Sequence, residues 1–543
     1  MNIKRDAFSI RSFLEELRKS RPEEIFEVDN KVKVDFEPTA YYLNLSKRNP
    51  VILFNKVDDF HNFSLVTNIF GSEERLATVA GINSISEVVE RWSSIANSES
   101  NETLLISEET APFISKITGE DLNLFDLPVP SHYELDGSKK GFSKYITSGL
   151  TTAIDPENQS TINLSFSRIQ PFERDKFAFD AGSRGHLWKY LNTSKEIGER
   201  LKMTILIGPN PIFYLLAASF IDNEYVKANK FFNVKFSNGY LNKIPIPSDT
   251  EIAIEAEFLP NETFDEGPFA EYVGYMGYDS TRFVAKVRSI LLKKNPIYYD
   301  IQPSNSSEHV NLFSVPRSSL VMKSVREVLP KGPAYEVKWP HYGGRFMSFG
   351  YVDRGGPGLA KQLGITILGL DPLWNKIVFI NEGKTELTLE NALINLAQLT
   401  EFSENHIAKI SNTFIISSDP TRNEPGNSGK IVFVTKGKFT RVEKEVKRDL
   451  VKLKTKRGSV LISHDYVDDQ KINVIVSQDI DLKDLDQIGW AISTRLNPDT
   501  DISIEKNKIT FSATRKVPPV ARVPKSVKEK VDRKMALLGD RIH

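Results

Sequence analysis

The chain has 543 residues, of which 40% are hydrophobic and 26% are charged, so it can bury large cores and is neither disordered nor collagen-like. Lysine and arginine together number 71, as do aspartate and glutamate, and this balance argues against a nucleic-acid partner, which normally requires a basic excess. The absence of cysteine excludes disulfides, thiolate nucleophiles, iron–sulfur clusters and cysteine-based zinc sites. The length predicts about three or four domains.

The start of the chain and its most apolar stretch both argue against a membrane protein. Residues 1–6 lead into an amphipathic helix and not into the apolar core of a signal peptide. Residues 204–221 are the most apolar stretch, but Pro209 and Pro211 divide it, whereas a membrane-spanning helix needs about 20 mostly apolar residues. We therefore expect a cytoplasmic protein without a membrane partner.

Residues 1–125 predict an N-terminal α/β domain. Residues 8–17 carry apolar side chains at helical spacing, and residues 51–54 are a short apolar run typical of a buried strand. A helix is predicted over residues 84–95, where a serine followed three positions later by a glutamate is a capping-box signal. Residues 127–130, with two prolines, predict a boundary or an extended linker.

Residues 126–315 predict a β-rich central domain. Segments with β-branched or alternating apolar residues recur there, separated by glycine, proline and asparagine. These predicted strands are residues 145–154, 161–168, 203–207, 251–258 and 282–292. Predicted helices at residues 185–191 and 212–220 interrupt them, so we expect a β-barrel or curled sheet with a few inserted helices.

Residues 316–510 predict a C-terminal α/β domain. Two blocks each combine an apolar strand with a following helix: residues 376–380 with 389–399, and residues 471–476 with 482–492. The blocks could be an internal repeat, but we prefer two βα units of one sheet. Residues 385–470 are interpreted as an insertion whose Lys- and Arg-rich part, 436–456, is solvated and does not bind nucleic acid.

Residues 511–543 predict a helical tail. From residue 515 onward the tail holds nine Lys or Arg residues against three Asp or Glu residues, and a helix is expected over residues 526–538. This helix could be a docking arm onto another subunit or a simple surface helix.

The most informative stretch for chemistry is residues 265–277. Glu266 and Glu271 stand five positions apart, and Gly267 and Pro268 between them predict a bend in place of a helix. Such a bend can direct both carboxylates into one cavity, with aromatic residues as apolar walls. A carboxylate against an apolar wall has a raised pKa, which suits proton delivery near neutrality. On spacing alone, however, a solvated acidic turn is the more frequent explanation.

A second cluster begins on the predicted strand that carries Asn163 and Arg168. In an extended strand these two side chains face opposite sides, so a bulge or a strand end is needed for both to reach one ligand. His186 follows 18 residues after Arg168 and Glu224 lies further on. Taken alone, His186 is most simply a satisfied surface or helix-start histidine, and Glu224 is an exposed acid at a helix end.

The order and spacing of these residues resemble the UbiD-like family of prenylated-FMN-dependent decarboxylases. The family signature is Asn-x-x-x-x-Arg on a strand, a His about 18 residues later, a metal-ligand Glu, and finally Glu-Gly-Pro-Phe/Tyr-x-Glu/Asp. The chain has Asn163 with Arg168, His186, Glu224, and Glu266 through Glu271 in that order. The resemblance covers most of the chain outside 385–470 and includes residues 37–40, 68–72, 207–211, 246–252 and 490–495.

The resemblance implies a fold and a set of ligands. The expected fold is an N-terminal α/β domain, a central split β-barrel that binds flavin, and a C-terminal α/β domain. Asn163, His186 and Glu224 would bind Mn²⁺ or Mg²⁺, which suit hard oxygen ligands with one imidazole, and K⁺ is common near the cofactor phosphate. Asp222 is the neighbour that could replace Glu224 in this role.

Prenylated FMN is the cofactor that the resemblance implies. The residues expected to line it are Asn163, Leu164, Ser165, Phe166, Ser167, Arg168, Gly185, His186, Ala218, Ser219, Glu224 and Arg354. Arg354 is included because it stands near the place of the family's phosphate-contacting lysine. Ala270 replaces the more usual glycine of the signature.

The implied reaction is a reversible, non-oxidative decarboxylation of an α,β-unsaturated or aromatic acid through the azomethine-ylide form of the cofactor. Arg168, Glu266 and Glu271 would form the catalytic network, with Glu271 protonating the substrate carbon. A flavin prenyltransferase would supply the cofactor, and a homodimer or higher homo-oligomer is expected. The alternative is a non-catalytic FMN-binding or structural subunit of a carboxylase assembly.

Overall fold

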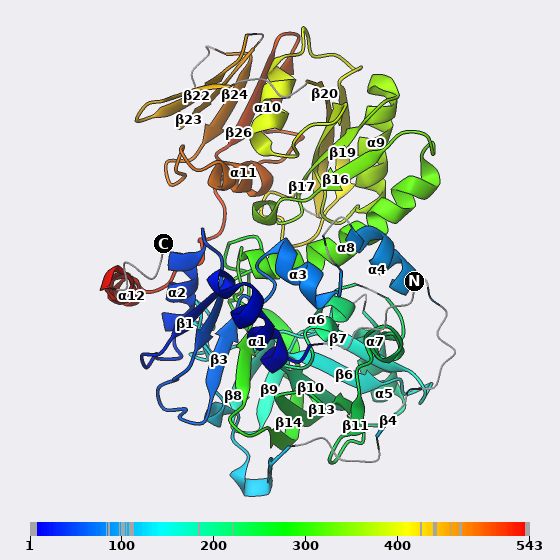
Figure 1. The fold of residues 1–543 in the computed structure, drawn as a ribbon, viewed down its shortest axis with the longest axis vertical. Helices are drawn as coiled ribbons and strands as arrows, with labels where there is room; N and C mark the ends of the chain where they lie inside the picture. The colour runs from blue at the N-terminus through cyan, green and yellow to red at the C-terminus, as the bar shows by residue number, and fades with distance from the viewer. Residues whose placement is uncertain are drawn as a thin grey trace. The chain divides into compact units, whose positions relative to one another are not determined.

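The computed structural model describes residues 8–82, 84, 87–96, 98, 104, 106–107, 113–182, 185–219, 221–423, 426–437, 442–456, 458–465 and 470–537. The chain forms two compact units (Figure 1): unit 1 combines residues 1–316 and 520–543, and unit 2 is residues 317–519. Both contain helices and sheets, which confirms the predicted mixed α/β class. The finer division of unit 1 at residue 125 stays a prediction.

The N-terminal part of unit 1 is a four-stranded sheet with helices. The strands, in spatial order, are β1 (Ile25–Val28), β2 (Val51–Phe54), β3 (Ser64–Thr67) and β15 (Ile297–Asp300). All four residues of β2 are buried, as its continuous apolar run predicts. The helices are α1 (Ile10–Ser20), α2 (Glu37–Leu45), α3 (Glu73–Val79) and α4 (Val88–Ala96). Part of the predicted helix 84–95 lies outside the described residues.

An antiparallel eight-stranded sheet forms the centre of unit 1. Its spatial order is β7 (Ile162–Phe166), β6 (Leu150–Ile154), β10 (Lys202–Ile207), β13 (Ile252–Glu266), β14 (Ser280–Leu292), β9 (Lys176–Phe179) and β8 (Ile169–Glu173), with β5 (Ser115–Thr118) also paired to β14. The two ends of this path, β7 and β8, are joined by only Ser167 and Arg168. A bridge between Ile146 and Ile169 ties β8 to the segment before β6. The sheet therefore curls until its ends meet; the split-barrel description itself stays a prediction.

Three helices and a small sheet complete the centre of unit 1. The helices are α5 (His186–Glu196), α6 (Ile212–Ala217) and α7 (Glu224–Phe232), and all three pack against β7. The last residue of the predicted helix 212–220 lies outside the described residues. The small sheet has the order β12 (Pro245–Pro247), β11 (Phe236–Asn238) and β4 (Ile106–Ser107).

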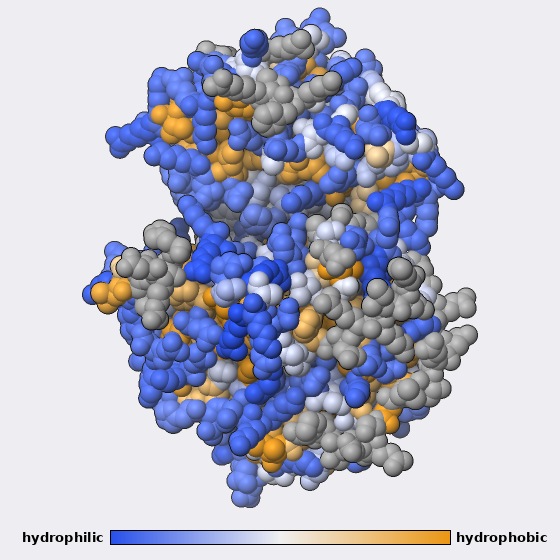
Figure 2. Space-filling view, in the orientation of Figure 1, coloured by the Kyte–Doolittle hydropathy of each residue, from blue (hydrophilic) through white to orange (hydrophobic). Residues whose placement is uncertain are grey.

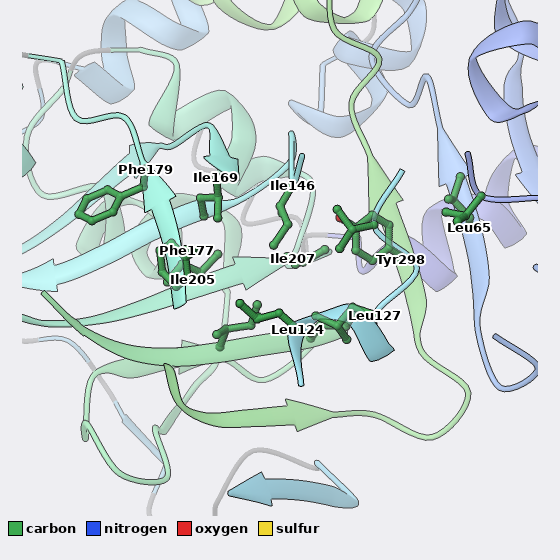
Figure 3. Close-up of a cluster of buried hydrophobic side chains, with 14 of the residues drawn as sticks. Leu65, Leu124, Leu127, Ile146, Ile169, Phe177, Phe179, Ile205, Ile207 and Tyr298 are labelled. Carbon is green, nitrogen blue, oxygen red and sulfur yellow. The ribbon is translucent and has the colours of Figure 1, made fainter. Parts of the chain in front are cut away.

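One apolar cluster joins the two sheets of unit 1. Figure 3 shows Leu65 and Tyr298 of the four-stranded sheet in the same cluster as Ile205 and Phe177 of the curled sheet. Residues 127–130 belong to neither a helix nor a strand, and they are buried here, with Leu127 and Val129 as core side chains; the predicted boundary at this point stays a prediction. Because both sheets bury their apolar faces in this cluster, we expect them to fold together.

Unit 2 contains two sheets around one core. The five-stranded sheet has the order β16 (Tyr335–Lys338), β17 (Met347–Val352), β18 (Ile377–Glu382), β20 (Asn427–Lys436) and β19 (Ile407–Phe414). The six-stranded sheet has the order β21 (Glu443–Val446), β22 (Leu450–Lys454), β23 (Ser459–Ser463), β24 (Ile472–Val476), β26 (Lys508–Ala513) and β25 (Ile502–Glu505). The helices are α9 (Gly356–Leu370), α10 (Leu389–Ala397) and α11 (Leu485–Thr494).

Two predictions for this unit were wrong. The βα units β18–α10 and β24–α11 do not share one sheet, because β18 and β24 belong to different sheets. Residues 385–470 are not a surface insertion either: β20 lies inside the five-stranded sheet and β23 inside the six-stranded one. Within the charged segment 436–456, Val451 and Leu453 are fully buried. The alternation of charged and apolar residues there reflects a strand with one face in the core.

The remaining helices are α8 (Ser307–Val328), the tail helix α12 (Lys525–Leu537) and four short 3₁₀ turns, η1 (Pro22–Glu24), η3 (Gly119–Asp121), η4 (Leu124–Asp126) and η5 (His341–Gly343). The tail helix packs on α2, where its Lys530 and Lys534 pair with the buried Glu37. In the described part of the chain, no helix combines the length and apolar character needed to span a membrane. On the face drawn in Figure 2, apolar residues form small groups between polar ones.

Candidate active site

Glu266 and Glu271 flank a bend at the end of β13, as the sequence predicts. Glu266 is the last residue of the strand, and Gly267 turns the chain with a φ of 113°. A side chain at this position would be strained by that φ and would approach the Cα of Asp279 to 3.1 Å. The backbone N–H of Glu271 donates to the carbonyl of Tyr275, which closes the far side of the bend.

Arg168 lies between the two carboxylates. Its Nη2 donates to Oε2 of Glu266 at 2.7 Å, its Nε lies 2.7 Å from Oε1 of Glu266, and its Nη1 donates to Oε1 of Glu271 at 3.2 Å. Because β7 ends at Phe166, Arg168 lies beyond the strand end, which is one of the two geometries that the sequence required. The three predicted catalytic side chains therefore form one contiguous network.

The two carboxylates have different surroundings. The Glu266 side chain is 3% exposed, whereas that of Glu271 is 32% exposed. Glu266 also accepts from Nε of Arg282 at 3.0 Å, and Nη1 of Arg282 donates to Asp180 at 2.6 Å. Two guanidinium groups surround Glu266, so the predicted apolar wall is not its main environment.

Arg282 is a member of the network that the sequence reasoning missed. It begins the predicted strand 282–292, and Phe264 is its paired residue on β13. Residues two apart on a strand share a face, so Arg282 lies on the same face as Glu266 two positions beyond Phe264. The hairpin register between β13 and β14 was the missing information.

Aromatic rings complete the surroundings of Arg168. The guanidinium carbon lies 5.1 Å from the centre of the Phe269 ring, and that ring lies 4.3 Å from the ring of Tyr145. Burial lowers the pKa of Arg168, but the carboxylates of Glu266 and Glu271 outweigh this effect and leave the pKa raised. The side chain is therefore a permanent cation held beside an apolar surface, where it could meet the carboxylate of an incoming acid.

The predicted metal ligands lie on elements that pack together. Asn163 is on β7, and His186 and Glu224 are the first residues of α5 and α7, which both contact that strand. Nδ2 of Asn163 donates to the hydroxyl of Ser165 at 2.6 Å, so its Oδ1 is the atom that a cation would use. Nε2 of His186 lies 3.9 Å from Oδ1 of Asp222, the alternative ligand.

Glu224 is buried, not exposed as its sequence context first indicated. Its exposed fraction is 6%, and burial raises its pKa to about 8, with a smaller contribution from Asp222. A divalent cation would favour the ionised form of this carboxylate, so Glu224 has the chemistry of a metal ligand. Among the described residues, no group of three or more His, Asp and Glu side chains is placed to hold a metal by itself. The amide of Asn163 would therefore be required.

The other predicted cofactor residues lie in unit 1, except Arg354, which belongs to unit 2. Leu164 and Ser167 are buried, Gly185 precedes α5, and Ala218 follows α6. The hydroxyl of Ser219 accepts from Trp92 and donates to Leu215, so only its backbone could face a ligand. Arg354 belongs to unit 2, where it is exposed and donates to the carbonyl of Gly332, and its cofactor role stays a prediction.

Three family models match the chain in order. The N-terminal domain of 3-octaprenyl-4-hydroxybenzoate carboxy-lyase matches residues 17–92, its Rift-related domain matches residues 105–306, and its C-terminal domain matches residues 449–527. Together these stretches cover more than half of the chain. The chain belongs to the UbiD family of carboxy-lyases. The third match begins inside the segment that the sequence reasoning took for an insertion.

Curated relatives and solved structures agree with this membership. A phenolic acid decarboxylase of Sedimentibacter hydroxybenzoicus is 25% identical over 411 residues, which are 72% of this chain and 83% of the relative. An anhydromevalonate phosphate decarboxylase of Methanosarcina mazei is 28% identical over 281 residues, which are 50% of this chain and 61% of the relative. The UbiD-class enzyme HmfF of Pelotomaculum thermopropionicum, in complex with FMN, shares the fold with a TM-score of 0.71 at 22% identity, over 79% of this chain and 94% of that chain.

A second solved structure gives the same result for the fold. Apo 3,4-dihydroxybenzoic acid decarboxylase of Klebsiella pneumoniae has a TM-score of 0.71 at 18% identity, over 80% of this chain and 98% of that chain. The predicted family and fold class are therefore confirmed.

Proposed function

We propose that this UbiD-family carboxy-lyase carries out a reversible, non-oxidative decarboxylation of an α,β-unsaturated or aromatic carboxylic acid with prenylated FMN. The observation that carries the proposal is the Arg168 guanidinium held between Glu266 and Glu271. The phenolic acid decarboxylase relative supports an aromatic acid as the substrate. The aromatic rings of Phe269 and Tyr145 beside Arg168 suit the same kind of substrate.

Each member of the network has a distinct role in this proposal. Arg168 binds and orients the substrate carboxylate, because a guanidinium can form two parallel hydrogen bonds with one carboxylate. Glu266 holds Arg168 in place and is itself held by Arg282. Glu271 delivers the proton to the substrate carbon after CO₂ leaves, and its partial exposure lets it regain a proton from solvent.

The cofactor would lie along β7. In the described part of the chain β7 is an edge strand, so one side of its backbone is not paired within the sheet. Asn163 through Arg168, with Gly185 and Ala218, would contact the flavin and its phosphate. Prenylated FMN supplies the electron sink for the departing carboxylate, a chemistry that amino-acid side chains lack. The FMN bound in the related HmfF structure supports a flavin here.

A divalent metal would connect the protein to the cofactor phosphate. Asn163, His186 and Glu224 would hold Mn²⁺ or Mg²⁺, with Asp222 as the possible substitute for Glu224, and K⁺ would bind near the same phosphate. The burial of the Glu224 carboxylate at the start of α7, a helix packed against the strand of Asn163, supports this assignment.

The proposal also names partners. A flavin prenyltransferase would supply the cofactor, and the chain would act in the cytoplasm as a homodimer or higher homo-oligomer. One structural relative is described as an evolved dimeric form. Light scattering of the purified protein measures the oligomeric state directly.

The alternative is a non-catalytic FMN-binding or structural subunit. Such a subunit has no requirement for a partly buried arginine that contacts two carboxylates, one of which reaches solvent. The intact network therefore favours the enzyme.

The decisive experiment is co-expression with a flavin prenyltransferase, mass spectrometry of the bound cofactor, and turnover of a panel of aromatic and α,β-unsaturated acids. We expect prenylated FMN and release of CO₂. Glu271→Gln should retain the cofactor and lose turnover. Glu262→Gln is the matched control, because Glu262 lies on β13, the strand that leads into the bend, but pairs with Lys176 at the surface. Unmodified FMN or none, together with no turnover, would support the alternative.

A further inference from the structure

A buried aspartate outside the predicted site accepts a hydrogen bond from the bend between Glu266 and Glu271. Asp136 is 1% exposed and lies in residues 133–137, the segment that is hydrogen-bonded to the bend between Glu266 and Glu271. Its Oδ1 accepts the backbone N–H of Ala270 at 3.0 Å, and its Oδ2 accepts that of Tyr133 at 2.9 Å. The next residue, Gly137, donates its backbone N–H to the carbonyl of Pro268 at 2.7 Å. Two adjacent residues thus hold the bend on both sides of Phe269.

We propose that Asp136 is a positioning residue that fixes the distance between Glu266 and Glu271 by holding the backbone between them. This inference rests on the proposed function of those carboxylates. Asp136 does not need to touch the substrate, because the bend it holds carries the proton donor. Small displacements of a catalytic group lower turnover strongly, so a rigid bend has a direct functional value.

The geometry requires a carboxylate at position 136. Both oxygens of Asp136 accept a backbone N–H, and an asparagine has only one oxygen for the two donors. The neighbouring glycine is required as well: Gly137 has a φ of 59°, and a Cβ there would lie 1.9 Å from the carbonyl oxygen of Phe142. The segment is therefore shaped to bring Asp136 onto the bend.

The charges around Asp136 keep it an acceptor near neutral pH. Burial raises its pKa to about 6, while His132, the two backbone N–H groups and Arg168 oppose this rise. Tyr133 and Tyr145 are titratable groups whose pKa the charge of Asp136 raises further. Above pH 6 the carboxylate is ionised and accepts both N–H groups.

Surface ion pairs cannot replace this contact. Lys139 pairs with Asp279 and Lys140 lies 3.7 Å from Asp265, but these side chains are largely exposed. Exposed ion pairs contribute little to stability and weaken as salt is added. The contact of Asp136 with Ala270 and the backbone bond of Gly137 with Pro268 are therefore the buried connections to the bend.

The test compares Asp136→Asn with Glu308→Gln in the full chain loaded with cofactor. Glu308 is also fully buried and also accepts two backbone N–H groups, from Asn68 at 3.0 Å and Phe70 at 3.2 Å, but it does not contact the bend. We expect Asp136→Asn to lower kcat about tenfold or more with little change in KM or cofactor content, since one charge-assisted hydrogen bond is lost. The amide of Ala270 should exchange with deuterium about tenfold faster in this variant. Glu308→Gln should retain kcat and the Ala270 exchange rate.

Each outcome decides between the proposals. If Asp136→Asn has an unchanged kcat and an unchanged exchange rate at the Ala270 amide, the positioning role is overturned. Turnover by the wild type in the same assay leaves the proposed function intact. A wild-type protein without turnover refutes the proposed function. In that case the deuterium exchange rate of the Ala270 amide still tests whether Asp136 holds the bend. If Asp136→Asn does not fold, fast exchange of the Ala270 amide in the folded wild type overturns the proposal and slow exchange supports it.

Discussion

Removing the charge of Glu266 should destabilise the protein far more than removing that of Glu271. Glu266 contacts two guanidinium groups in an almost fully buried position, with hydrogen bonds of 2.7 Å to Arg168 and 3.0 Å to Arg282. Among the described residues, the Glu271 carboxylate is hydrogen-bonded to one guanidinium, that of Arg168 at 3.2 Å, and its side chain is 32% exposed. The substitutions Glu266→Gln and Glu271→Gln remove one charge each and keep the side-chain shape.

The expected magnitudes follow from these contacts. A charge-assisted hydrogen bond contributes about 1.5–3 kcal/mol, and a buried ion left without any partner costs about 3–5 kcal/mol. In Glu266→Gln neither guanidinium is left alone, because Arg168 keeps Glu271 and Arg282 keeps Asp180. We therefore expect a loss of about 2–3 kcal/mol for Glu266→Gln, and about 0–1 kcal/mol for the single, partly exposed pair that is lost in Glu271→Gln.

Urea unfolding of the cofactor-free protein, followed by circular dichroism, measures the difference. With an m-value of about 3 kcal/mol/M, a loss of about 2–3 kcal/mol lowers the midpoint by about 0.7–1 M. The midpoint of Glu271→Gln should stay close to that of the wild type, and Glu262→Gln serves as the surface control. Equal shifts for the two variants, or a larger shift for Glu271→Gln, would refute the roles that we assign from burial.

Two further predictions concern buried charges. Burial raises the pKa of Glu224 to about 8, so between about pH 5 and 8 the folded protein keeps a proton on this carboxyl that the unfolded chain releases. Without metal, the free energy of unfolding of the wild type should therefore fall with rising pH relative to that of Glu224→Gln. The expected slope is up to about 1.4 kcal/mol per pH unit. Urea unfolding across this range, with and without Mn²⁺, measures the slope, and parallel pH curves would contradict it. In unit 2, Asp371→Asn should cost about 3–5 kcal/mol, since Asp371 is the carboxylate partner of the buried Arg345 and of Arg317; a thermal melt equal to that of wild type would contradict this.

Where a feature depends on neighbouring residues in the chain, the sequence predicted it well. The run 51–54 is a strand at those residues, and the predicted strand 203–207 is β10 within one residue. Gly267 and Pro268 place a bend between Glu266 and Glu271, because glycine permits the required φ and proline interrupts regular structure. The family motifs added Arg168 to the predicted catalytic trio, and its side chain contacts both carboxylates.

Features that depend on strand register or on the partner of a strand were not predictable in the same way. Arg282 reaches Glu266 only through the pairing of β13 with β14, and Asp136 reaches Ala270 across 134 positions of the chain. Residues 431–434 are as apolar as residues 377–380, yet only the sheet order shows that β20 pairs directly with β18. Local pattern gives a strand, whereas its neighbour is decided by packing over the whole unit.

The topology of the curled sheet explains why the arginine of this site stands where it does. β7 and β8 are opposite ends of the strand order, yet only Ser167 and Arg168 separate them in the chain. In the described part of the chain, β7 is an edge strand that pairs only with β6. The backbone of Ser167 and Arg168 leaves the sheet here, and the side chain of Arg168 contacts Glu266 at the β13–β14 hairpin. A flavin along β7 would therefore meet Arg168 where that edge ends. A substitution that changes the backbone conformation of Ser167 and Arg168 should affect the flavin contacts and the carboxylate network together, because both depend on these two residues.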